Sequence, residues 1–102
     1  MFVAVGFHRP LPGNENLVID SMHRFGKAMI GKPGFRQAFV LQNKDRGELL
    51  GLAIWDSLEA MQAARPDMER AIAEDDFDSW ETESPRAYPY EVIWSYGELG
   101  GA

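Results

Sequence analysis

The stretch LLGLAIWDSLEAM at residues 49–61 constrains the fold most, because its hydrophobic period changes in the middle. Residues 49–55 are apolar at almost every position, which indicates a strand that is buried on both of its faces. From Asp56 onward the spacing of the apolar residues is helical, so a helix begins directly after the strand. A sheet that contains such a strand must have both of its apolar faces shielded from water.

The N-terminal third predicts one strand and one helix. Residues 2–8 alternate between bulky apolar positions and a face that includes small residues, and a proline-rich loop ends this strand. Asn14 or Asn16 caps the helix that follows. Its apolar residues recur at spacings of three or four positions: Val18, Met22, Phe25 and Met29. The Gly-Lys-Pro-Gly turn at 31–34 ends the helix.

Two further strands are predicted on either side of a short turn. Residues 35–42 form the first, and the turn at 43–47 is rich in residues that tolerate positive φ, so it leads back into the strand at 49–55 as a hairpin. The last strand is predicted at 88–96, with Tyr90 and Trp94 on one of its faces.

The second helix is predicted in two pieces. Asp56 or Ser57 caps it, and Asp56 with Glu59 has the spacing of a capping box. Pro66 cannot continue a helix in its interior, so we expect a break after Arg65 and a new helical turn that runs to Ala73.

This order of elements predicts an α+β chain with the ferredoxin-like βαββαβ split, in which two helices cover one face of a four-stranded antiparallel sheet. The 102 residues form one domain, residues 1–102, with a flexible tail at 97–102. The third strand has Leu50, Leu52 and Ile54 on one side and Leu49, Ala53 and Trp55 on the other, so an apolar face stays open after the helices cover one side of the sheet. A second copy is the simplest cover, so we expect a homodimer.

Composition removes several classes of function. The chain has no cysteine, which excludes disulfides, thiolate nucleophiles and cysteine-bound zinc. Its net charge of -6 argues against a nucleic-acid partner, because phosphate binding needs clustered Lys and Arg. No apolar run approaches the roughly 20 residues that span a bilayer, and the first residues lack a basic leader. We therefore expect a soluble cytoplasmic protein with no membrane partner.

Two short motifs give the chain a family resemblance. KPGF at 32–35 and AIWDSLEAM at 53–61, within the split topology from about 2 to 96, resemble the antibiotic biosynthesis monooxygenase family of dimeric α+β barrels. The resemblance implies a dimeric α+β barrel in which two sheets pair. Members of that family include monooxygenases that oxidise polycyclic aromatic substrates without metal or flavin, haem-degrading enzymes, and proteins with no assigned reaction.

The haem-degrading members of the family resemble one another at residues that this chain lacks. They carry an Asn on the first strand, where this chain has Gly6 or Phe7, and a Trp in the second helix, where it has Ala63 or Ala64. Their haem-ligating His has no counterpart between residues 61 and 79. Haem degradation is therefore not expected.

His8 is the candidate catalytic residue. His8 and His23 are the only histidines, so they are the only side chains of a type that titrates near neutral pH. His8 ends the first strand on the face with small residues, where it could accept a proton from an aromatic substrate, although a surface histidine beside the proline loop is the simpler explanation. The predicted ligand pocket comprises Gly6, Arg36, Trp55, Tyr90 and Trp94.

The simpler explanation for the aromatic residues of the predicted pocket is that they pack in the core or at an interface instead of binding a ligand. Two histidines cannot supply a three-histidine metal site, so no metal is expected. The resemblance to the family implies that no cofactor is needed. The function expected is a cofactor-independent monooxygenase that acts on a small aromatic or quinone-like molecule. The alternatives are a non-catalytic protein that binds a small molecule, and a structural dimer whose pocket has filled with side chains.

Overall fold

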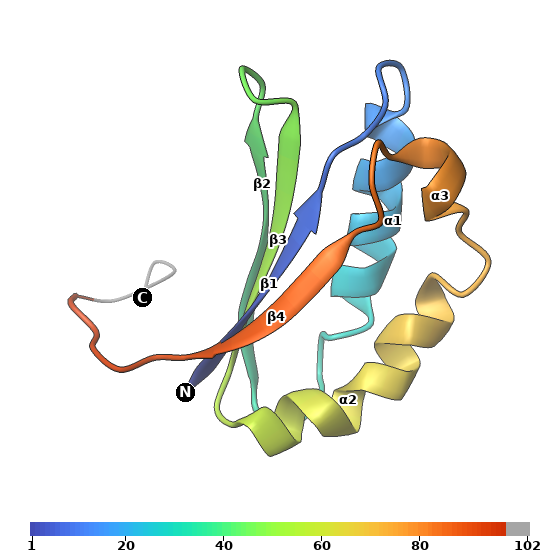
Figure 1. Cartoon of the computed structure of the whole chain (residues 1–102). Coiled ribbons are helices and arrows are strands. Elements are labelled where there is room, and N and C mark those ends of the chain that lie inside the picture. Colours follow the sequence, from blue (N-terminus) through green and yellow to red (C-terminus); the bar gives the residue numbers. More distant parts are fainter. Residues whose placement is uncertain (98–102) are drawn as a thin grey trace.

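The computed structural model describes residues 1–97, and the predicted tail, apart from Gly97, lies outside the described residues. The predicted order of elements is confirmed, and a short third helix is added (Figure 1). The elements are β1 (Phe2–His8), α1 (Glu15–Lys27), β2 (Phe35–Asn43), β3 (Glu48–Trp55), α2 (Leu58–Ala71), α3 (Phe77–Trp80) and β4 (Arg86–Glu91).

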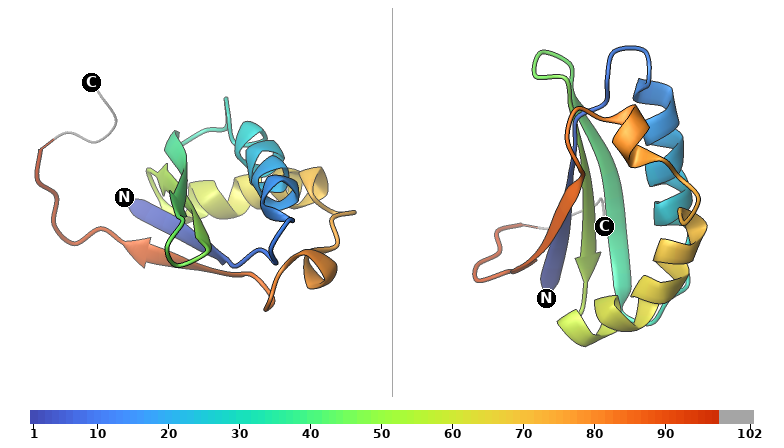
Figure 2. Two further views of the ribbon diagram at one scale, coloured as in Figure 1. Left: turned by 90° about the horizontal axis from the view of Figure 1, so that it is seen from above. Right: turned by 45° about the vertical axis from the view of Figure 1, so that its right-hand side comes forward.

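The strands form one antiparallel sheet in the order β2-β3-β1-β4, so β1 and β3 are the central strands. Along β1 the register runs from Phe2 opposite Trp55 to His8 opposite Leu49. All the helices of residues 1–97 lie against one side of the sheet, and none of them lies on the other side (Figure 2). This is the predicted α+β fold with a ferredoxin-like split.

The two faces of the sheet carry side chains of different size. Because directly opposed residues in antiparallel strands share a face, the register assigns the pairs Ala4–Ala53 and Gly6–Gly51 to the helix side. The opposite side, which we call the open face, bears mainly bulky apolar side chains: Val3, Val5, Phe7, Phe39, Leu41, Leu50, Leu52, Ile54, Tyr88 and Tyr90.

The buried core lies between the sheet and the helices in two clusters. One comprises Met29, Ala53, Trp55, Ala64 and Met68, and the other comprises Val18, Met22 and Leu49. Long methionine side chains from the helices reach down to small residues of the sheet. A Cβ placed on Gly51, for example, would lie 3.3 Å from the terminal methyl carbon of Met22. Met22, which belongs to the apolar stripe predicted for the first helix, therefore fills this space.

Helix α2 corrects two predictions. Ser57 is the N-cap, since its hydroxyl accepts a hydrogen bond from the Ala60 N–H at 3.1 Å, while Asp56 pairs with Arg36. The break predicted at Pro66 is wrong, because the helix continues through this residue. A proline inside a helix costs about 3 kcal/mol. Ala64 and Met68 on either side of it are buried in the core, and their packing holds the helix together.

The prediction for the last strand is also wrong at its C-terminal end. Strand β4 ends at Glu91, which pairs with Phe2, and the Val92 N–H donates to the Met1 carbonyl oxygen at 3.0 Å. Beyond that point no strand among the described residues lies alongside, so residues 93–96 cannot form a ladder. Trp94 therefore does not share a strand with Tyr90. Among residues 1–97, no helix is long and apolar enough to cross a membrane.

Candidate functional site

His8 lies where β1 ends, on the side of the sheet that faces the helices. Its imidazole ring packs against Phe77 of α3, with ring centroids 5.9 Å apart. Its Nε2 lies over Gly6, because a Cβ placed on this glycine would be 3.8 Å from that nitrogen. The small residue two positions earlier in the strand thus leaves room for the ring to fold back along the sheet.

Glu81 orients the His8 ring. The Oε2 of Glu81 lies 2.8 Å from Nδ1 of His8, and its Oε1 accepts a hydrogen bond from the Arg9 backbone N–H at 2.8 Å. The Glu81 side chain has no exposed area, and that of His8 is 15% exposed. An ionised carboxylate can only accept hydrogen bonds, so Nδ1 carries the proton, and Nε2 of the neutral ring keeps a free lone pair. This is the arrangement of a general base.

Backbone hydrogen bonds fix Glu81 beside β1. The Leu11 N–H donates to the Trp80 carbonyl at 2.8 Å, and the Thr82 N–H donates to the Arg9 carbonyl at 2.9 Å. These bonds form a short antiparallel bridge between Pro10 and Glu81. Backbone hydrogen bonds of the residues on either side of Glu81 therefore fix its position, and a side chain on a free surface loop has no such bonds.

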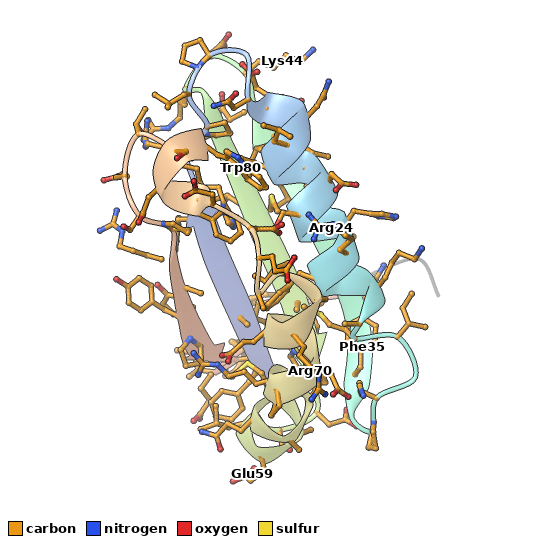
Figure 3. The ribbon with its side chains drawn as sticks, turned by 90° about the vertical axis from the view of Figure 1, so that its right-hand side faces the viewer. Arg24, Phe35, Lys44, Glu59, Arg70 and Trp80 are labelled. Atoms are coloured by element: carbon orange, nitrogen blue, oxygen red, sulfur yellow. The ribbon has the colours of Figure 1, made fainter. Side chains whose placement is uncertain are left out.

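A second polar cluster attaches the segment before α3 to α1. Asp75 accepts hydrogen bonds from Arg24 at 3.0 and 3.1 Å and from the Ser21 hydroxyl at 2.6 Å, and Arg24 also donates to the Ala71 carbonyl. The hydrogen bonds that Arg24 donates to Asp75 first, and to Asp20 second, raise the pKa of Arg24 above its ordinary value. The link therefore stays charged across the physiological pH range. Figure 3 views this helical side, with Arg24 and Trp80 labelled.

A small cavity of about 130 Å³ adjoins His8. Its lining is Phe7, His8, Arg9, Glu48, Glu83, Ser84 and Arg86. It is smaller than typical small-molecule pockets, which measure about 300–1,000 Å³. A groove of about 370 Å³ lies next to the β2–β3 turn and shares Glu48 with this cavity, but it contains none of the predicted site residues. The space beside His8 therefore suits a small molecule better than a polycyclic one.

The structure brings together only two of the residues predicted for the site. Gly6 and His8 are neighbours, whereas Trp55 lies fully buried at the far end of the same face, opposite Phe2. Its indole Nε1 finds no acceptor among the described residues. Tyr90 lies half exposed on the open face.

The remaining two predicted pocket residues are exposed. Arg36, a predicted pocket residue, is exposed and pairs with Asp56. The Trp94 side chain lies beyond the end of β4. A pocket in one subunit therefore does not gather all five residues.

Glu81 is the site residue that the sequence does not reveal. It is one of six carboxylates between residues 74 and 83, a segment typical of a solvated acidic surface. No spacing distinguishes it from its neighbours. Its burial results from pairing with residues 9–11, which lie far away in the sequence. The only local signal is Trp80 beside it, a large apolar residue that anchors the segment to the core.

Comparison with known proteins adds a family and a fold. A family model described as antibiotic biosynthesis monooxygenase matches residues 1–72. The structure of Rv0793 from Mycobacterium tuberculosis is similar, with a TM-score of 0.79 and 14% identity over 94% of this chain and 98% of that chain. SnoaB, a cofactor-independent oxygenase from Streptomyces nogalater, has a TM-score of 0.77 and 13% identity, covering 95% and 97% of the two chains. No curated protein matches.

Proposed function

This chain belongs to the antibiotic biosynthesis monooxygenase family, and from that premise we propose that it is a cofactor-independent monooxygenase that acts on a small aromatic or quinone-like molecule. The observation that carries the proposal is the pair of His8 and Glu81, with the Nδ1 to Oε2 distance of 2.8 Å. The similar fold of SnoaB, a cofactor-independent oxygenase, supports the reaction class.

The reaction needs one general base and a cavity that shields the substrate from water. His8 Nε2 takes the phenolic proton, and Glu81 stabilises the imidazolium that forms. The phenolate then gives an electron to dioxygen, and the two radicals combine to form a carbon–oxygen bond. His8 returns the proton to the peroxide. Cleavage of the O–O bond, with loss of the hydrogen on that carbon, leaves a carbonyl on the substrate and releases water. The substrate supplies every electron that reduces dioxygen.

The size of the cavity narrows the substrate class. At about 130 Å³ it suits a single ring, such as a catechol or hydroquinone. Its charged lining includes Arg9 and Arg86 beside Glu48 and Glu83, so polar substituents on the ring would find partners. Single-ring quinols are therefore expected to react faster than anthrones.

Oxygen incorporation tests this function. Purified protein is incubated with catechol, hydroquinone and anthrone under ¹⁸O₂, with dioxygen uptake and product mass recorded against a protein-free control. We expect one labelled oxygen atom in the product. In His8→Gln the side chain can still donate to Glu81, so the fold persists while kcat/KM falls at least about 100-fold. His23→Gln, at the exposed second histidine, is the matched control and keeps the wild-type rate.

Glu81→Gln tests the orienting carboxylate separately. It keeps a hydrogen-bond acceptor but removes the negative charge beside the imidazolium. We expect a fall in kcat of about 10-fold or more. Equal rates in wild type and His8→Gln would remove His8 from the mechanism, and an unlabelled product would contradict the oxygenase.

The open face supports a homodimer. Its bulky apolar side chains belong to the two central strands and to both edge strands, and no helix of the described chain covers them. Two-fold pairing of two such faces buries them in one step and gives the dimeric α+β barrel. Sedimentation at micromolar concentration should find a dimer. Leu52→Asp, at the centre of the face, should give a folded monomer, while Ile30→Asp outside it stays dimeric.

One observation favours a second candidate, a structural dimer with a filled interior. The Met22 methyl group occupies the space above Gly51, where a flat ligand would otherwise lie. Thermal unfolding with aromatic acids and quinones tests this alternative. A bound ligand at about 100 times its Kd adds about 2.7 kcal/mol to the free energy of unfolding. Oxygenase activity predicts a shift with at least one single-ring quinol, whereas a filled interior predicts none.

A further inference from the structure

We propose that Phe77 is a removable cover over His8, and that its place against His8 and Trp80 is a binding site for one uncharged aromatic ring that carries a hydroxyl group. The inference rests on the proposed function, because it says where the ring of the substrate lies. Phe77 is not among the residues that line the cavity of about 130 Å³. Its displacement therefore adds space beside the base.

The side chain of Phe77 packs against two other rings. Its ring centroid is 5.9 Å from that of His8 and 5.7 Å from that of Trp80, with interplanar angles of 45° and 73°. These are favourable geometries for aromatic pairs. A flat ligand in the same place makes the same two contacts. A hydroxyl on its edge donates to Nε2 of His8, which the bond between Nδ1 and Glu81 leaves as an acceptor.

Phe77 is held less firmly than the other large apolar residues on the helix side of the sheet. It is partly buried and belongs to neither core cluster, and α3 contains no buried residue. Trp80, by contrast, packs against the cluster of Val18, Met22 and Leu49. Moving the Phe77 ring outward therefore leaves both core clusters intact.

The turn that carries this ring is fixed at both ends and held weakly in the middle. At one end Asp75 bonds to α1, and at the other Trp80 bonds to the loop after β1. Apart from bonds within the turn itself, the only hydrogen bond of residues 76–79 to the rest of the described chain runs from the Asn14 side chain to the Ser79 carbonyl oxygen, at 3.5 Å. The middle of the turn can therefore open locally while both ends stay in place.

Charge around the turn selects an uncharged ligand. Residues 74–83 carry six carboxylates, and the exposed Asp76 and Asp78 flank Phe77 directly. A ring that bears its own carboxylate is repelled by these charges. A phenol or a quinol is neutral and brings the hydroxyl that Nε2 of His8 accepts. The ligand class is therefore neutral single-ring phenols, and aromatic acids are excluded from it.

Phenol titration of the full chain, measured by calorimetry, tests the site. In the wild type the ligand must displace Phe77, and a ligand that needs a minor conformation binds more weakly in proportion to the population of that conformation. Phe77→Ala removes this cost, so the Kd of phenol should fall about 10-fold or more. Phe25→Ala is the matched control, because Phe25 is also partly buried but packs against the other core cluster, and it should leave this Kd unchanged. Circular dichroism verifies the fold of each variant.

Two further ligands show what the site recognises. Toluene has the size of phenol but no hydroxyl, and benzoate carries a negative charge. Both should bind to Phe77→Ala about 10-fold more weakly than phenol. A purely apolar cavity would reverse the order of phenol and toluene, because it would leave the hydroxyl without a partner.

Fluorotryptophan reports the displacement in the wild type, without a substitution at Phe77. It gives three ¹⁹F resonances, for Trp55, Trp80 and Trp94, and Trp80→Phe assigns the second of them. Saturating phenol should move the Trp80 resonance, because the ring that packs against this indole changes. The Trp55 resonance should stay in place, since Trp55 lies at the far end of the sheet face.

The outcomes separate the cover from the reaction. A folded Phe77→Ala with the wild-type Kd for phenol, tighter binding of toluene than of phenol, or a Trp80 resonance that phenol does not move overturns the cover. The wild-type resonance decides the matter alone if Phe77→Ala does not fold. Phenol binding with all the expected signs, together with an unlabelled product under ¹⁸O₂, supports the cover and overturns the oxygenase. A labelled product with an unmoved Trp80 resonance does the reverse.

Discussion

The two faces of the sheet differ in which layer contributes the bulky side chains. On the helix side the sheet contributes small residues such as Gly6, Gly51 and Ala53, and long side chains descend from the helices. On the open face the bulk belongs to the sheet itself, through residues such as Phe39 and Leu52. The size of the residues on a strand face thus indicates what lies above it. Long side chains from another layer fill the space above small residues. Bulky residues pack against a surface that is itself nearly flat.

The comparison also explains where chemistry is possible. A face of small residues leaves space that other groups must fill, and at one end of β1 it is filled by the ring of His8 instead of a methionine. Substitutions on the two faces should therefore differ in how much they lower the free energy of unfolding and in how that effect depends on protein concentration.

Truncation on the helix face should have the largest effect. Trp55 is fully buried, so Trp55→Ala is expected to lower the free energy of unfolding by about 3–5 kcal/mol at every protein concentration. Urea unfolding followed by circular dichroism measures this. Trp55→Phe is the control, because it keeps most of the ring and removes an indole N–H that has no acceptor among the described residues. Its cost should be clearly smaller, and equal costs would mean that the core does not pack on the ring.

Truncation on the open face should depend on concentration. Leu52→Ala is expected to cost about 2 kcal/mol when the protein is dimeric, because it opens a hole in the buried interface. Below the dimer Kd the same side chain is only partly buried, and the cost should fall under about 1 kcal/mol. Urea unfolding at two protein concentrations measures the difference. A cost that does not change with concentration would contradict a second copy on this face.

The smallest effect is expected at the glycine beneath Met22. Gly51→Ala adds a Cβ 3.3 Å from the methyl end of this flexible side chain, which can move by a few tenths of an ångström. The gain from replacing glycine in a strand offsets part of the strain, so the free energy of unfolding should change by less than about 1 kcal/mol. Gly34→Ala is the contrast, since its φ is +82° and the new Cβ would lie 2.6 Å from the Ala60 Cβ. A large loss at Gly51 would show that Met22 is rigid.

Much of the fold could be predicted because its signals are local. The period change at 49–61 places a strand and a helix side by side, and the hairpin turn at 43–47 fixes how two strands pair. The order of elements then leaves few topologies, and the observed sheet is the one expected. The family resemblance drawn from the same stretch is confirmed by the match over residues 1–72.

The errors share a physical cause, which is that contacts distant in sequence override local preference. Pro66 breaks a helix in isolation, but the burial of Ala64 and Met68 keeps this one intact. Residues 93–96 have the composition of a strand, but a strand needs a neighbour and β1 begins at Phe2. For the site, the small-residue face led to His8, whereas Glu81 could not be singled out because its partners lie at the other end of the chain.

The distance between His8 and Glu81 along the chain sets the order in which the protein can be completed. The two residues are 73 positions apart, and the bridge between 9–11 and 80–82 encloses almost everything made in between. During synthesis on a ribosome, the β2–β3 hairpin can assemble while the carboxylate has not yet been added. A chain released early, before Trp80, carries the histidine with nothing to orient it. The oriented histidine can therefore form only after residues 80–82 have been synthesised.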